Sequence, residues 1–131
     1  MHKITGSLWE EVITGAFGMT PTADHPLLNM YREAAKKYAP EERWGTFFLA
    51  GVVFADPLVE ALKRVGPNLS TEACLKALNS IRDHQTIGPK VTWTPQIHQG
   101  TDSIQVQKCG PNVEYILLQD WTSNDLATWK K

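Results

Sequence analysis

The sequence has little net charge, a formal −1, and it contains neither a long apolar run nor more than two cysteines. Its 131 residues include 13 Lys and Arg against 14 Asp and Glu, which leaves no electrostatic footprint for a nucleic acid. The densest apolar stretch, 46–55, is shorter than the ~20 residues of a membrane-spanning helix. The first residues, MHKITGSLWEEV, do not have the layout of a signal peptide. We therefore expect either a cytosolic protein or a piece that lacks its start.

Patterns that indicate catalysis or metal binding are also missing. The four histidines have no metal-ligand spacing, and the sequence contains no nucleotide-binding or nucleophile motif. An enzyme needs a nucleophile, a base or a metal brought together, and no such combination stands out. We therefore expect a protein that is not an enzyme and that holds neither a metal nor an organic cofactor.

The two cysteines, Cys74 and Cys109, do not form a metal-binding or redox motif. Two interpretations stay open for them. They are either separate thiols, one on a helix and one at the end of a hairpin, or a disulfide formed in an oxidising compartment.

Tryptophan is frequent for this length, but no Lys or Arg is interleaved with it, which disfavours a surface that stacks nucleic-acid bases. Core packing is the main expectation for these side chains, with a small-molecule cleft as the alternative. The five residues are Trp9, Trp44, Trp93, Trp121 and Trp129.

Helical patterns fill the middle of the chain. A helix is expected from Pro26 to the residue before Pro40, capped by Asp24 or His25, and a third helix begins after the capping Ser70. Between them, a longer helix ends at Gly66-Pro67. Its front half, Phe47–Phe54, is apolar all round, so we expect it to be buried on every side.

Strand patterns occupy the two ends of the chain. A short strand is expected over 12–17, and residues 91–94 alternate as a strand that carries Trp93. Two further alternating runs, 104–107 and 113–118, are separated by the turn sequence CGPN and predict an antiparallel hairpin.

The order of these motifs carries a resemblance. A helix follows DHP, an aromatic-led helix ends in EALKRVG, and a capped helix reads LSTEACLKALNSI; IGPKVTW and HQGTDSIQV follow. In this order, over about residues 12–121, the chain resembles the C-terminal third of the type I periplasmic binding proteins. The most similar subgroup binds leucine, isoleucine and valine for ABC importers.

The resemblance implies an α/β fragment of a two-lobed fold, with three helices, a few strands and the C-terminal hairpin. Residues 1–20 and 102–131 would belong to one lobe and residues 21–101 to the other, with crossovers near 19–21 and 98–103. The all-apolar half-helix would pack under a parallel sheet that this chain does not contain. The chain would then be a fragment of a protein about three times longer.

The resemblance also implies positions for a solute and for a hinge. Phe47, with Phe48 as the alternative register, matches an aromatic that faces the solute. Gly51-Val52 stands where relatives often carry Gly-Tyr or Thr-Tyr, so the tyrosine hydroxyl is missing here. Plain core packing is the alternative for Phe47. The crossovers would place the hinge at Thr20 and Pro21 and again at His98, Gly100 and Thr101, with Trp93 as a buried anchor beside it.

The function implied by the resemblance is a periplasmic or extracellular solute-binding component of an ABC importer. It would bind an amino acid or a similar small molecule, dock on a membrane permease, and as a fragment bind solute weakly or not at all. Two alternatives stay open. One is a ligand-sensing domain of a receptor or regulator with the same fold, and the other is a free-standing interaction module that self-associates or binds another chain through Phe47–Phe54.

Overall fold

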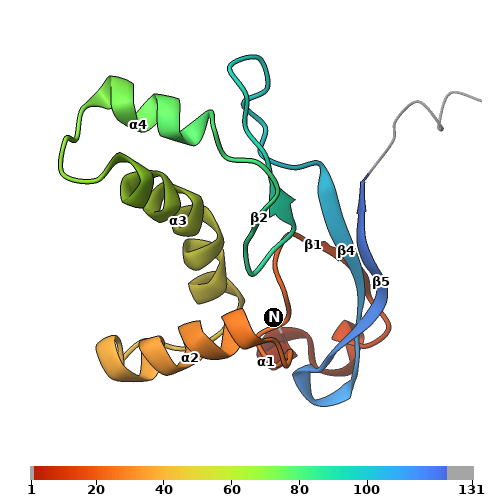
Figure 1. Ribbon diagram of the computed structural model, residues 1–131. Helices are drawn as coiled ribbons and strands as arrows, with labels where there is room; N and C mark the ends of the chain where they lie inside the picture. The colour runs from red at the N-terminus through yellow and green to blue at the C-terminus, as the bar shows by residue number, and fades with distance from the viewer. Residues whose placement is uncertain (1, 124–131) are drawn as a thin grey trace, which may run out of the picture. The chain divides into compact units, whose positions relative to one another are not determined.

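The computed structural model describes residues 2–123, so Trp129 lies outside the described residues. Its contacts divide the chain into two compact units (Figure 1). Unit 1 consists of Met1–Phe17 and Asp102–Lys131, and unit 2 consists of Gly18–Thr101. Each unit is described by itself below.

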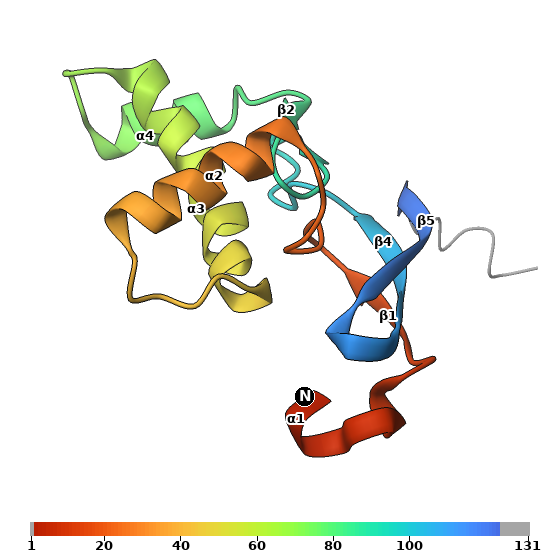
Figure 2. The same ribbon diagram turned by 90° about the horizontal axis from the view of Figure 1, so that it is seen from below.

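Unit 1 is built on a three-stranded antiparallel sheet in the order β1-β4-β5, with β4 in the centre (Figure 2). The strands are β1 (Ile13–Ala16), β4 (Ser103–Cys109) and β5 (Tyr115–Ser123), preceded by α1 (His2–Thr5) and the 3-10 turn η1 (Gly6–Trp9). The second 3-10 turn, η2 (Pro111–Val113), joins β4 to β5, and Asn112 adopts a left-handed φ of 58° there. The hairpin expected from CGPN is confirmed.

The buried face of this sheet is polar. Gln105 and Gln107 are buried beside Cys109, and their amides form a chain in which Gln107 donates to Gln105 and Gln105 donates to Asp120. The opposite face carries Ile13 and Ile104, which are both exposed. Removing apolar side chains from water lowers the free energy, so further protein packed on this face would be stabilising.

Unit 2 contains the three helices that the sequence predicts (Figures 1 and 2). They are α2 (Pro26–Tyr38), α3 (Thr46–Val65) and α4 (Thr71–Leu78). His25 caps α2 by accepting the Leu27 N–H, and Ser70 caps α4 by accepting the Ala73 N–H at 3.1 Å. The expected starts of both helices are therefore confirmed.

The predicted strand at 91–94 is shorter than expected. The structure contains only a two-stranded ladder, β2 (His84–Gln85) paired with β3 (Lys90–Val91). Trp93 lies beyond β3 and is half-buried. The backbone N–H of Trp93 donates to the Ile81 carbonyl and not to a strand partner, so the ladder ends before Trp93.

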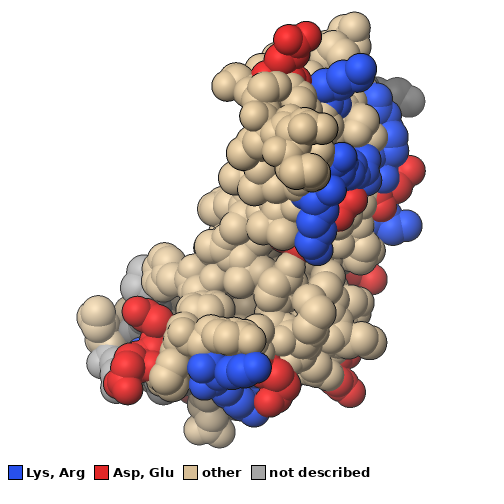
Figure 3. All heavy atoms as spheres, turned by 60° about the vertical axis from the view of Figure 1, so that its left-hand side comes forward, with Lys and Arg blue, Asp and Glu red and all other residues tan. Residues whose placement is uncertain are grey.

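The prediction that Phe47–Phe54 is buried on every side is wrong for this chain. Leu49 is 2% exposed, but Phe47 is 95% and Phe54 is 72% exposed. An apolar helix becomes buried all round only when elements cover all its sides, and the core partners of α3 lie on one side. Figure 3 shows a broad surface without charged side chains between separate groups of both signs.

Two small clusters form the core of unit 2. One joins Leu28, Leu49 and Ile87, and the other joins Ala61, Ala77, Ile81 and Val91.

Among the described residues, no helix has both the length and the apolar character needed to cross a membrane.

Candidate functional site

An aromatic cluster lies where α3 begins. The Trp44 ring is tilted against the Phe48 ring, with 5.5 Å between the ring centroids. The Arg32 guanidinium lies 5.5 Å from the centroid of Trp44, within reach of a cation–π contact. Trp44 Nε1 and Arg32 Nη2 both donate to the Pro21 carbonyl, each at 2.9 Å. The cluster therefore ties the predicted hinge residue Pro21 to the predicted site residue Phe48.

Phe47 is placed differently from Phe48. Successive helical residues point about 100° apart, so when Phe48 packs against Trp44, its neighbour points elsewhere. Phe47 is almost fully exposed. Of the two registers considered for a solute-contacting aromatic, Phe47 is the one that has its ring available.

The other predicted hinge residues form a second group at the end of unit 2. Thr92 N donates to the Gly100 carbonyl at 2.8 Å, and Trp93 Nε1 donates to the His98 carbonyl at 3.0 Å. Gln99 Nε2 donates to the Thr101 carbonyl at 3.0 Å. At the other end of the unit, the Thr20 carbonyl accepts the Ala23 N–H. The structure thus connects His98 with Gly100 through the Thr92–Trp93 segment, and Pro21 with Phe48 through Trp44.

Cys74 and Cys109 are both free thiols and belong to different units. Cys109 is completely buried, and burial raises its pKa, which disfavours the reactive thiolate. A disulfide between them stays the alternative prediction. In the part of the chain that the structure describes, no group of three or more His, Cys, Asp and Glu side chains could hold a metal ion.

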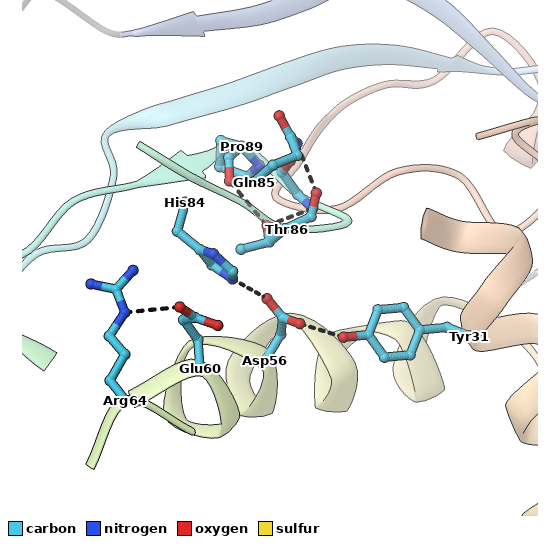
Figure 4. A network of polar contacts seen from close by, with 9 residues as sticks. Tyr31, Asp56, Glu60, Arg64, His84, Gln85, Thr86 and Pro89 are labelled. Atoms are coloured by element: carbon cyan, nitrogen blue, oxygen red, sulfur yellow. Dashed lines mark hydrogen bonds and ion pairs between the residues drawn. The ribbon is translucent and has the colours of Figure 1, made fainter. Parts of the chain in front are cut away.

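A polar network that the sequence analysis missed lies inside unit 2 (Figure 4). The Asp56 carboxylate on α3 accepts a hydrogen bond from the Tyr31 hydroxyl on α2. Its other oxygen lies 2.7 Å from His84 Nε2 on β2. The Asp56 and His84 side chains are only 13% and 21% exposed. One carboxylate therefore joins three elements, and its signal in the sequence is a single acidic residue after the apolar run of α3.

One turn further along α3, a more exposed ion pair runs beside this network (Figure 4). Glu60 accepts from Arg64 Nε at 2.8 Å, and this bond holds the pKa of Glu60 below its ordinary value. Arg64 also donates to the carbonyl of Ser80 at 3.2 Å. These contacts attach the end of α3 to the segment that follows α4.

The Tyr31 contact predicts a dependence of stability on pH. Burial, together with the hydrogen bond to the Asp56 carboxylate, raises the pKa of Tyr31 well above its ordinary value of about 10. The stability that the neutral hydroxyl contributes is fully present below about pH 10 and is lost as the pH rises through the raised pKa. We expect Tyr31→Phe to lose stability less steeply between about pH 8 and about pH 11 than the unchanged chain. Urea unfolding at both pH values measures this, and equal slopes would contradict it.

The fold of this chain recurs in solved structures. No protein-family model matches the chain, and no curated protein matches its sequence. A possible leucine/isoleucine/valine-binding protein from Rhodopirellula baltica matches 89% of this chain with a TM-score of 0.76 and 22% identity. A branched-chain amino acid ABC transporter protein from Thermus thermophilus with bound valine matches 95%, with a TM-score of 0.80 and 15% identity. The chain has part of the fold of type I periplasmic binding proteins.

These neighbours are binding proteins rather than enzymes, and their solutes differ. A fatty acid ABC transporter substrate-binding protein from Thermomonospora curvata matches 88% of this chain, with a TM-score of 0.71 and 20% identity. The chain spans about a third of each of these proteins, namely 32%, 36% and 31% of their lengths. The resemblance read from the sequence is therefore confirmed for the fold.

Proposed function

We propose that this chain is part of the solute-binding component of an ABC importer, acting outside the cytoplasm without catalysis or a cofactor. The observation that carries the proposal is the fold, which matches substrate-binding proteins over 88–95% of this chain. The intact protein would capture an amino acid or a similar small molecule and deliver it to a membrane permease. Closure of two lobes about a hinge is the motion that such binding proteins use.

The proposal assigns the two units to different lobes. Support comes from the contacts of the chain, which separate the terminal segments from the middle with borders at 17/18 and 101/102. The chain passes from one unit to the other at each of these two borders. Such short passages suit a hinged protein of two lobes, because a few residues between compact bodies can absorb the change in backbone angles.

The proposal also holds that two-thirds of the binding protein lies outside this chain. Each unit exposes apolar side chains: Phe54 on α3 in unit 2, and Ile13 and Ile104 on the sheet in unit 1. Exposed apolar faces of this kind mark places where further protein packs. Their cover would come from the part of the fold that the neighbours have and this chain lacks.

Phe47 is the proposed solute-contacting residue, and calorimetry tests it. In the intact protein, we expect Phe47→Ala to lower the affinity for its amino acid by about tenfold or more, because a buried aromatic contact is lost. Phe54→Ala is the matched control, since it removes another exposed phenylalanine of the same helix. An equal effect of both variants, or none, would contradict the assignment.

The chain of 131 residues gives a second, independent test of the same proposal. In calorimetric titrations with branched-chain and other amino acids, we expect this chain to show no tight binding, because most of the fold that encloses a solute is absent. Tight binding by this chain alone would contradict its role as one part of a larger site. A secretory signal in the gene upstream would favour transport over a sensor domain with the same fold.

A second candidate function is an interaction module, and the exposure of Phe47 and Phe54 on one helix favours it. In this case the α3 surface would bind a second chain or a second copy. Light scattering separates the two candidates: a specific dimer supports the module, and a well-dispersed monomer argues against it.

A further inference from the structure

The indole of Trp93 lies directly on the backbone of Gly100. A Cβ atom built on Gly100 would lie 2.4 Å from Cζ2 and 2.7 Å from Cε2 of Trp93, far closer than real side-chain contacts allow. No torsion of an alanine relieves this overlap, because the position of Cβ is fixed by the backbone. Glycine at position 100 is therefore what permits the ring to pack there.

Trp93 is itself held by the core of unit 2. Its ring packs against the cluster of Ala61, Ala77, Ile81 and Val91. The backbone N–H of Trp93 donates to the Ile81 carbonyl at 3.1 Å, and the Arg82 guanidinium donates to the backbone carbonyl of Trp93. The ring that covers Gly100 is thus fixed from the side of the core.

The segment between Trp93 and Gly100 is closed into a loop. The indole N–H donates to the His98 carbonyl at 3.0 Å, and Thr92 N donates to the Gly100 carbonyl at 2.8 Å. Inside the loop, Thr94 and Ile97 exchange backbone hydrogen bonds. Gly100 is the last residue but one of unit 2, so the loop closes immediately before the border between the units.

We propose that Trp93 and Gly100 form a latch that fixes the chain up to Gly100, so that bending between the units begins only at Thr101. The latch rests on the proposed hinge and narrows it: His98 and Gly100 belong to the fixed side, and Thr101 and Asp102 carry the change in backbone angle. The bond from the exposed Gln99 side chain to the Thr101 carbonyl has to yield when the chain bends there. Trp93 is then a positioning residue of the hinge and not a solute contact.

A double-mutant cycle tests the latch in the chain of 131 residues, with the hydrogen exchange of the Thr92 amide as the readout. We expect Gly100→Ala to speed this exchange by about tenfold or more, because the displaced ring no longer holds the loop closed. In a Trp93→Ala background, the same glycine substitution should have no further effect, since the ring that it collides with is gone. Additive effects would mean that the ring does not lie on Gly100 in solution, and they would overturn the latch.

Matched controls keep the cycle interpretable. Gly51→Ala makes the same chemical change where nothing lies within 4 Å of the new Cβ, so Thr92 should exchange as before. The amide of Met19, which donates to the Ile87 carbonyl in the same unit, reports whether unit 2 stays folded. If Gly100→Ala does not fold, Trp93→Phe, which removes the bond to the His98 carbonyl, should speed Thr92 exchange by a smaller factor. Unchanged exchange in the folded variants overturns the latch.

Relaxation dispersion of the backbone amides tests where the bending begins, because hinge motions between domains take microseconds to milliseconds. We expect no exchange contribution through Gly100 and a clear one at Thr101 and Asp102. In Gly100→Ala the contribution should begin near Thr94. A contribution that already begins near Thr94 in the unchanged chain overturns the proposal. Neither measurement involves a solute, so failure of the latch and failure of the solute-binding function are distinguishable.

Discussion

Replacing Asp56 by alanine is expected to destabilise the chain by about 2–4 kcal/mol. The carboxylate is mostly buried and is the partner of both the Tyr31 hydroxyl and the His84 ring. Its removal leaves two polar groups without their partner and disconnects α2, α3 and β2. A group left unsatisfied in a protein interior costs its desolvation free energy, which is why the loss exceeds that of one exposed hydrogen bond.

Urea unfolding followed by tryptophan fluorescence measures this loss. Glu60→Ala is the control, because Glu60 is the next carboxylate along the same helix and its partner Arg64 is more exposed. We expect a much smaller effect from Glu60→Ala than from Asp56→Ala. Equal effects of the two substitutions would mean that the network of Figure 4 does not hold the three elements together.

Replacing Ile87 by alanine is expected to cost about 2–5 kcal/mol, the largest effect among the single substitutions considered. Ile87 is completely buried against Leu28 and Leu49, and its carbonyl accepts the Met19 N–H. The smaller side chain leaves a cavity in a cluster whose other buried members, among the described residues, are only Leu28 and Leu49. The cluster is therefore poorly able to compensate for the lost contacts.

Phe47→Ala provides the contrast to Ile87→Ala in the same urea experiment. Although phenylalanine is the larger residue, its exposure predicts a change within about 0.5 kcal/mol. A loss comparable to that of Ile87→Ala would show that Phe47 is covered in solution, for example by a second copy. The same unfolding measurement on the intact Phe47→Ala protein separates a lost solute contact from misfolding.

Local patterns in the sequence predicted the elements well. The cap at Ser70 and the turn CGPN act within a few residues, and the hydrogen bonds that they predict are present. The order of the elements was enough to indicate the fold, which the comparison with solved structures confirms. Two predictions failed. The strand at 91–94 reaches only Val91. The burial of α3 failed because apolar character indicates that a helix needs cover but not whether the same chain supplies it.

The candidate site could be predicted only in part. Phe47 and Phe48 are adjacent in sequence, and only the packing of Trp44 distinguishes the exposed ring from the packed one. The Asp56 network left little signal, since its partners lie 25 and 28 residues away in the sequence. Long-range contacts between side chains depend on how the elements pack, and no local periodicity encodes them.

The sequence by itself determined the helices, the hairpin and the resemblance to a binding-protein fold, because caps, turns and periodicity are local and act before any packing. The tertiary structure alone decided the contact of Trp93 with Gly100 and the bonds to Asp56. The first depends on a glycine that leaves room for a ring seven residues away along the chain. The second depends on three elements that converge on one carboxylate, an arrangement fixed by the shape of the core rather than by any single motif.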